Sequence, residues 1–122
     1  MASNGFTYHG ATAMLNFLLR SGTVYGKLHI DDPIDGTMNP SVITTRASMT
    51  FGAPDTNGVI DLSTPASWSV SSTEKLWGIS IWSASTAGNC LAIRAFSSAK
   101  PVYNGDTLVL ASMPISLPIV GQ

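Results

Sequence analysis

The alternation of apolar and polar residues after residue 22 is the feature that most constrains the fold. The alternating segments are short, and glycine, proline, asparagine and aspartate residues separate them. We interpret five of these segments as strands: residues 24–30, 43–51, 58–62, 76–82 and 90–96. Several short strands at fairly regular spacing are typical of a β-sandwich or a β-barrel. The pattern therefore predicts a mainly β fold.

Two of these strands are expected to be neighbours in one sheet. Residues 86–89, which include Gly88, form the turn between segment 76–82 and segment 90–96. The alternation places one set of apolar side chains on one face of each strand: Trp77, Ile79 and Ile81 in the first, and Leu91, Ile93 and Ala95 in the second.

The last part of the chain predicts a hairpin and an edge strand. Asn104 and Gly105 are a strong hairpin signal between a brief strand near Val102 and a strand at 107–110. The final run then alternates, with Met113, Ile115, Leu117 and Ile119 facing one way and Pro114, Ser116 and Pro118 the other. Proline cannot donate to a β-ladder, so this strand is expected at a sheet edge.

One short helix precedes the strands. Ala11, Met14, Leu15 and Leu18 recur at spacings of three and four residues and predict one apolar face over residues 11–20, with Gly22 just beyond the end. Residues 1–10 are interpreted as an extended arm, and residues 11–122 as a single domain. The apolar run at 13–19 is far shorter than the ~20 residues of a membrane span and lacks the basic segment of a signal peptide. We therefore expect no membrane partner.

Charged residues are scarce, which bears on the partners. They make up 11% of the chain, against about 25% in an average domain, and the net charge is −1. The six Lys and Arg residues are scattered, so direct binding of nucleic acid is not expected. Apolar residues reach 44%, a balance that favours a surface packed against other subunits over a monomer coated with Ser and Thr. The single cysteine, Cys90, excludes an intramolecular disulfide and is expected to be buried.

The residues that usually perform chemistry are not grouped in the sequence. His9 and His29 stand apart, with no partner at metal-ligand spacing. The loop with Asp31, Asp32 and Asp35 is interpreted as a solvated turn, with a calcium site as the alternative. We predict no catalytic residue, cofactor or metal and therefore no enzyme; a hydrolase would need a cleft that holds His29 beside a carboxylate or a serine.

Aromatic residues are the candidates for contacts with other proteins. Trp68 and Trp82 are expected to fill a small core or an intersubunit contact, with a carbohydrate-stacking surface as the alternative. In the arm, Phe6 and Tyr8 are candidate anchors along the sheet edge of a neighbouring subunit, with a disordered arm as the alternative.

The order of several short motifs carries a resemblance. In this order they are Val24-Tyr25-Gly26-Lys27-Leu28-His29-Ile30-Asp31-Asp32-Pro33, Thr50-Phe51-Gly52-Ala53, Gly58-Val59-Ile60, Ala66-Ser67-Trp68, Leu76-Trp77-Gly78-Ile79, Thr86-Ala87-Gly88-Asn89-Cys90-Leu91-Ala92 and Tyr103-Asn104-Gly105-Asp106-Thr107-Leu108. Over most of residues 10–119 the chain resembles a family of small tailed-phage virion proteins that are labelled tail fibre or head decoration proteins.

The resemblance implies a single-domain β-sandwich of about seven or eight short strands with one short N-terminal helix. It also implies a structural virion protein, made in the host cytoplasm. We expect a capsid decoration (cement) protein that binds the major capsid protein and copies of itself, with a trimer as a plausible form. A tail fibre or tail-tip module that binds a host glycan or protein is the alternative. The candidate interface residues are Phe6, Tyr8, Trp68 and Trp82.

Overall fold

The computed structural model describes residues 6–117 and contains one helix and nine strands. The helix is α1 (Tyr8–Arg20). The strands are β1 (Val24–His29), β2 (Ala47–Phe51), β3 (Val59–Ile60), β4 (Leu62–Thr64), β5 (Ala66–Ser69), β6 (Glu74–Trp82), β7 (Cys90–Val102), β8 (Thr107–Leu110) and β9 (Ile115–Ser116). The predicted mainly β fold with one N-terminal helix is confirmed.

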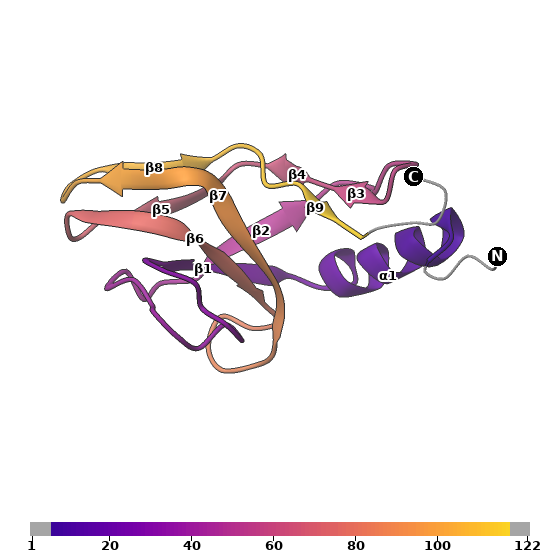
Figure 1. The fold of residues 1–122 in the computed structure, drawn as a ribbon, viewed down its shortest axis with the longest axis horizontal. Helices are drawn as coiled ribbons and strands as arrows, with labels where there is room; N and C mark the ends of the chain where they lie inside the picture. The colour runs from indigo at the N-terminus through magenta and orange to yellow at the C-terminus, as the bar shows by residue number, and fades with distance from the viewer. Residues whose placement is uncertain (1–5, 118–122) are drawn as a thin grey trace.

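The strands form one large curled sheet and two short pairs (Figure 1). The large sheet has the order β4-β2-β1-β6-β7, and every pairing in it is antiparallel. Strands β3 and β9 form one short pair, and β5 and β8 form the other. The expected pairing of segments 76–82 and 90–96 is confirmed as β6 and β7, whose turn ends with Ala87 and Gly88 at positive φ.

The predicted hairpin at Asn104-Gly105 is only half right. The turn exists, because the Asp106 amide donates to the Tyr103 carbonyl at 3.0 Å. However, the strands on its two sides pair with different partners: β7 with β6, and β8 with β5. Hydrogen bonds from Gly105 to Val70 and from Val70 to Asp106 hold this turn beside the link between β5 and β6. The turn at Asn104-Gly105 and the link between β5 and β6 therefore lie side by side, and the turn connects the large sheet to the β5–β8 pair.

A register shift in β6 changes which side chains enter the core. The shift lies between Leu76 and Gly78, where β6 and β7 fall out of step. A bulge reverses the side-chain alternation on its two sides. As a result Leu76, and not Trp77 as predicted, shares the buried face with Ile79 and Ile81.

Other strand boundaries also differ from the prediction. Segment 43–51 is a strand only from Ala47, because residues 43–46 lead into the sheet without pairing. Segment 58–62 is split at Asp61, where the chain passes from the β3–β9 pair to the edge of the large sheet. Strand β5 was not predicted. The edge position of the last strand is confirmed by β9, while Ile119 lies outside the described residues.

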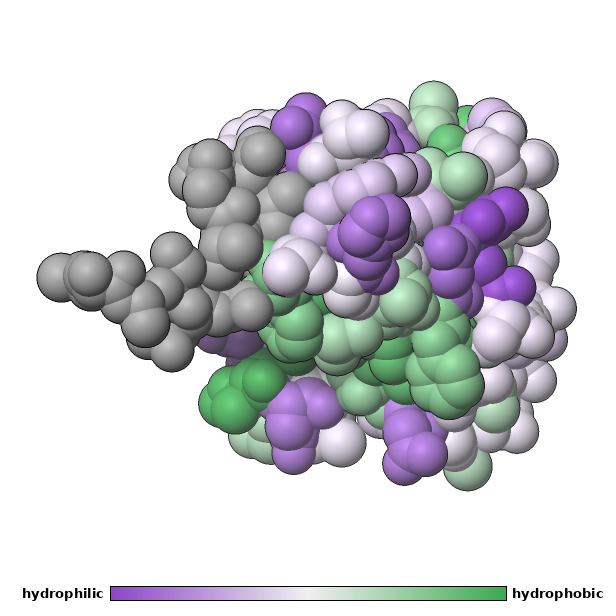
Figure 2. All heavy atoms as spheres, turned by 90° about the vertical axis from the view of Figure 1, so that its right-hand side faces the viewer, coloured by the Kyte–Doolittle hydropathy of each residue, from purple (hydrophilic) through white to green (hydrophobic). Residues whose placement is uncertain are grey.

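Helix α1 begins three residues before the predicted start, because Thr7 caps it. The Thr7 side chain accepts a hydrogen bond from the Gly10 amide at 3.2 Å, which satisfies one of the free donors of the first turn. The buried stripe is Ala11, Leu15 and Leu19, so the prediction that Met14 faces the core is wrong. Apolar side chains also gather on the surface at the α1 end of the molecule (Figure 2).

The arm and domain boundaries stay a prediction. Residues 1–5 of the expected arm lie outside the described residues, and residues 8–10 belong to α1 and are not extended. In the described part of the chain, no helix combines the length and apolar character that crossing a membrane requires.

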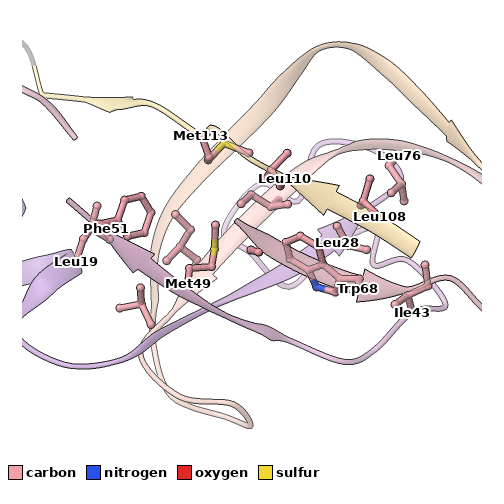
Figure 3. Close-up of a cluster of buried hydrophobic side chains, with 14 of the residues drawn as sticks. Leu19, Leu28, Ile43, Met49, Phe51, Trp68, Leu76, Leu108, Leu110 and Met113 are labelled. Carbon is pink, nitrogen blue, oxygen red and sulfur yellow. The ribbon is translucent and has the colours of Figure 1, made fainter. Parts of the chain in front are cut away.

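The core lies between the large sheet and the β5–β8 pair, and Figure 3 shows side chains from both entering it. Leu28 and Met49 come from β1 and β2, while Trp68 and Leu108 come from β5 and β8. The Trp68 indole donates to the Gly26 carbonyl at 3.1 Å. A Cβ at Gly26 would stand 3.0 Å from that indole, so the glycine in β1 makes room for the tryptophan.

Candidate protein-interaction site

Three buried polar side chains form a hydrogen-bonded chain inside the large sheet. His29 ends β1, and Ser80 and Trp82 lie on β6 beside it. The Ser80 Oγ is 2.7 Å from the His29 Nε2 and 2.7 Å from the Trp82 Nε1. The other ring nitrogen of His29, Nδ1, lies 2.9 Å from the Met38 carbonyl. The histidine thus joins the sheet to the loop that follows β1.

The partners of His29 define its protonation. Nδ1 faces two backbone carbonyls, of Met38 and Asn39, so it must carry the proton. The Trp82 indole can only donate to Ser80, which leaves the Ser80 hydroxyl proton for Nε2 of a neutral His29. Burial lowers the pKa of His29, and the charge of Lys27 adds to this, against the opposing effect of the two carbonyls.

His29 and Ser80 are as close together as the residues of a catalytic dyad, but a substrate cannot reach them. Both side chains are fully buried at 0% exposure, and the indole of Trp82 occupies a lone pair of the serine oxygen. A nucleophile must reach a substrate atom, which this arrangement prevents. The geometry instead fits a structural role, since all three polar groups satisfy one another.

Residues 30–42, here called the 30–42 loop, are fixed to the sheet at several points. Glu74 on β6 accepts hydrogen bonds from the Ser41 hydroxyl and, at 3.0 Å, from the Val42 amide. Gly36, at φ +99°, packs so closely that a Cβ there would lie 2.6 Å from the Cys90 sulfur. Together with the bonds of His29, these contacts hold the loop in one shape.

The aspartates of this loop bind its own backbone. Asp31 accepts from the Asp32 amide at 2.8 Å, Asp32 from the Ile34 amide at 2.9 Å, and Asp35 from the Thr37 amide at 3.0 Å. The hydroxyl of Thr37 also donates to Asp35, and its bond lowers the pKa of that carboxyl. Among the described residues no group of three side chains suited to a metal ion is found. The carboxylates therefore act as turn formers here.

The two tryptophans predicted at an interface lie inside the chain. Trp68 is 2% exposed and Trp82 is 7% exposed. The guanidinium of Arg46 lies 4.3 Å from the ring centre of Trp82 and donates to the carbonyls of Ala84 and Ala87, which covers the indole from outside. Neither ring is available on the surface of the isolated chain, either for a protein or for a stacked sugar. Cys90 is only half-buried, and burial raises its thiol pKa.

The other two predicted interface residues are on the surface. Phe6 is 39% exposed and Tyr8 is 41% exposed, at the start of α1. The Tyr8 ring stacks obliquely on His9, with 5.0 Å between the ring centres. Both aromatic side chains are thus available to a partner at the α1 end of the molecule.

The outward side of α1 carries further apolar residues. The sequence analysis did not single out Ala13 and Phe17, and it placed Met14 and Leu18 on the core face. Phe17 is 73% exposed and Met14 is 39% exposed. They border a shallow hollow of about 370 Å³, together with Ala13 and Leu18. We call these four residues the outer face of α1. Gly10, Ala13, Met14 and Phe17 show the spacing of a second apolar stripe, the signal by which sequence reasoning could have found this face.

Comparison with protein families places this fold among phage virion structural proteins. The family model described as "Podophage GP4 fiber I protein gp80" matches residues 5–117. Since the match spans nearly the whole chain, the protein belongs to this gp80 fiber I family. A comparison with curated proteins finds no match.

Proposed function

We propose that this chain is a component of the virion fibre that works by binding other virion proteins through the outer face of α1. The observation that carries the proposal is the exposure of Phe17, an aromatic side chain left 73% exposed beside Met14. Exposed apolar clusters of this kind are typical of protein contacts, because burial against a partner removes them from water. The printed family name, which refers to a fibre, supports the location.

The proposal includes the absence of catalysis. Its support is that the one serine–histidine pair of the described structure is buried and serves the Trp82 indole and the 30–42 loop. The proposed partners are copies of the same chain and a neighbouring virion protein. Nucleic acid is not among them, since the six cations of the chain form no stripe that would follow a phosphate backbone.

A capsid decoration protein is the second candidate. One observation favours it: the longest described helix and the longest described strand each have 13 residues, which gives no element for a long shaft. A small subunit of this kind is suited to bridging neighbouring proteins of a shell, with the major capsid protein as its partner. Copy number separates the two candidates, because a shell has hundreds of equivalent positions and a fibre has few.

The test is to locate and count the chain in purified particles. An epitope tag after residue 122 and antibody labelling in the electron microscope would give the position, and quantitative mass spectrometry would give the copies for each major capsid subunit. Label at the tail with few copies is the expected result. Label over the whole head with hundreds of copies would replace the fibre proposal by the decoration proposal, and particles without the chain would contradict both.

A further inference from the structure

The 30–42 loop presents an isoleucine in a backbone conformation that β-branched residues rarely adopt. Ile34 is 70% exposed and has φ +62°. A β-branched residue at positive φ is a genuine outlier, because its Cβ crowds the backbone. The loop holds it there through Asp32, His29 and Glu74. Strain of this kind in a well-fixed loop points to a function of the exposed side chain.

The surroundings of Ile34 define the chemistry of the surface. Met38 is 50% exposed and Ile30 is 48% exposed, so aliphatic groups gather on the loop. Asp31, Asp32 and Asp35 are exposed on the same loop. The loop is therefore an aliphatic knob with an acidic rim, and a matching surface needs an apolar hollow with cations.

Such a surface exists elsewhere on the same chain. A groove of about 370 Å³, roughly a dozen water molecules in volume, runs between residues 94–101 of β7 and residues 110–114. We call it the β7 groove. Its lining includes Phe96, Met113 and Pro114 as apolar groups and Arg94 and Lys100 as cations. The Asp61 carboxylate lies beside the lining, where it accepts hydrogen bonds from Ser112 and Met113 and offsets part of the Arg94 charge. Arg94 is fixed by a hydrogen bond from its Nε to the Pro114 carbonyl at 2.8 Å.

The position of the β7 groove leaves it open to an incoming segment. Strand β7 is an edge of the large sheet, since it pairs only with β6 there. In Figure 1 the groove segments lie along the upper side of the molecule, and the 30–42 loop lies at the lower left. One copy can thus offer its knob and its groove at the same time, to two different neighbours.

We infer that the 30–42 loop of one copy docks by Ile34 into the β7 groove of the next copy. The contact is head to tail, so it builds a closed ring or an open filament and not an isolated two-fold dimer. Attraction between the three aspartates and the cations of the groove, chiefly Lys100 because Asp61 offsets part of the Arg94 charge, sets the register and speeds the encounter. This inference goes beyond the proposed function, since it adds to the outer face of α1 a second pair of surfaces, through which copies of the chain join one another.

The test uses the full chain in sedimentation velocity over a range of concentrations and salt. The wild-type chain is expected to associate, and association should weaken as salt screens the charges. Ile34→Asp removes the knob, and aspartate tolerates positive φ, so the fold is kept. Ala99→Glu places a carboxylate in the lining of the groove and repels the acidic rim. Each variant alone should associate at least tenfold more weakly than wild type.

Mixing the two variants gives the sharpest result. The intact knob of Ala99→Glu can still enter the intact groove of Ile34→Asp, so an equal mixture should form a dimer and stop there. Val109→Asp is the matched control, since Val109 is 57% exposed on β8 and lines neither surface. It should associate as wild type does. Circular dichroism melts of all variants check that they are folded.

Several results would overturn the inference. A wild-type chain that stays monomeric up to millimolar concentration would do so, as would an Ile34→Asp variant that still assembles. Failure of the mixture to form a dimer would show that the knob binds something other than this groove. The proposed function fails separately: if copies associate but particles lack the chain, only that proposal is wrong, and if particles contain it while copies never associate, only this inference is.

Discussion

The interior around Ser80 and the outer face of α1 differ in how fully their side chains are matched with suitable surroundings. Around Ser80 every donor meets an acceptor, and none of the buried side-chain polar atoms in the described residues lacks a partner. On α1, by contrast, Phe17 and Met14 are exposed to water although the same helix buries Leu15 and Leu19. Exposing Phe17 to water does not stabilise the isolated chain, whose buried side-chain polar groups all have partners in the described residues. The difference teaches that His29, Ser80 and Trp82 help to build the interior, while Phe17 and Met14 stay on the surface, where we propose the contact with a partner.

The largest effect is expected from the interior. Trp68→Ala removes the indole at the centre of the core and should lower the free energy of unfolding by about 3–5 kcal/mol. Chemical denaturation measures this loss. Trp68→Phe is the control that keeps an aromatic ring and loses the bond to Gly26, so it should cost clearly less. Equal losses for the two variants would mean that packing of the ring contributes little.

The buried hydrogen-bonded chain should give the next largest effect. Ser80→Ala leaves the Trp82 indole and the His29 ring without their shared partner, which should cost about 1–3 kcal/mol. Thermal unfolding checks this, with Ser67→Ala on an exposed site of β5 as the control. If Ser80→Ala is as stable as the control, the hydrogen bonds of Ser80 do not stabilise the sheet. The role that we assign to the interior would then be wrong.

The buried His29 of this hydrogen-bonded group should make the stability of the fold depend on pH. The pKa of His29 is lower in the folded chain than the usual value of about 6.5, so below that pH the unfolded chain binds more protons. The free energy of unfolding should therefore fall as pH drops from about 6.5, and be flat above it as far as this group is concerned. His29→Gln should lose this slope even though it is less stable. A slope that survives the substitution would assign the effect to another group.

The smallest effect concerns the loop and has the opposite sign. Ile34→Gly relieves the strain of positive φ but adds backbone freedom to the unfolded chain, so unfolding should become harder by up to about 1 kcal/mol. The measurement is again chemical denaturation. Asn39→Gly, also at positive φ, is the control: asparagine tolerates that conformation and its side chain donates to the Asp32 carbonyl, so this variant should gain nothing. A marked loss at Ile34 would show that its side chain stabilises the monomer.

The sequence predicted the fold class better than the way the sheets connect. Period-two alternation located β1, β6 and β7, because each has a face in the core. The bulge at Trp77 and the corner at Asn104 could not be seen, since both depend on which strands pair across the molecule. For the same reason nothing in the sequence placed Ser80 beside His29, which lies 51 residues away. Thr7, by contrast, is a residue type typical of helix caps, and this signal is present in the sequence itself.

The surface candidates show the same limit. Phe6 and Tyr8 are exposed, although Tyr8 lies in α1 and not in an extended arm. Trp68 and Trp82 are buried, because the chain's own sheets supply enough apolar surface to enclose them. Local composition identifies which residues can be anchors. It does not tell which of them the fold buries, and only residues that stay exposed can contact a partner.

The most direct test compares the two regions in one experiment, by counting the copies of the chain in purified particles. Met14→Ser combined with Phe17→Ser alters only the outer face of α1, while Ser80→Ala alters only the interior. Grown at a temperature where both variants stay folded, the surface variant should be lost from particles and the Ser80→Ala variant should be incorporated as wild type is. Normal incorporation of the surface variant would contradict the claim that this apolar face joins the chain to the virion.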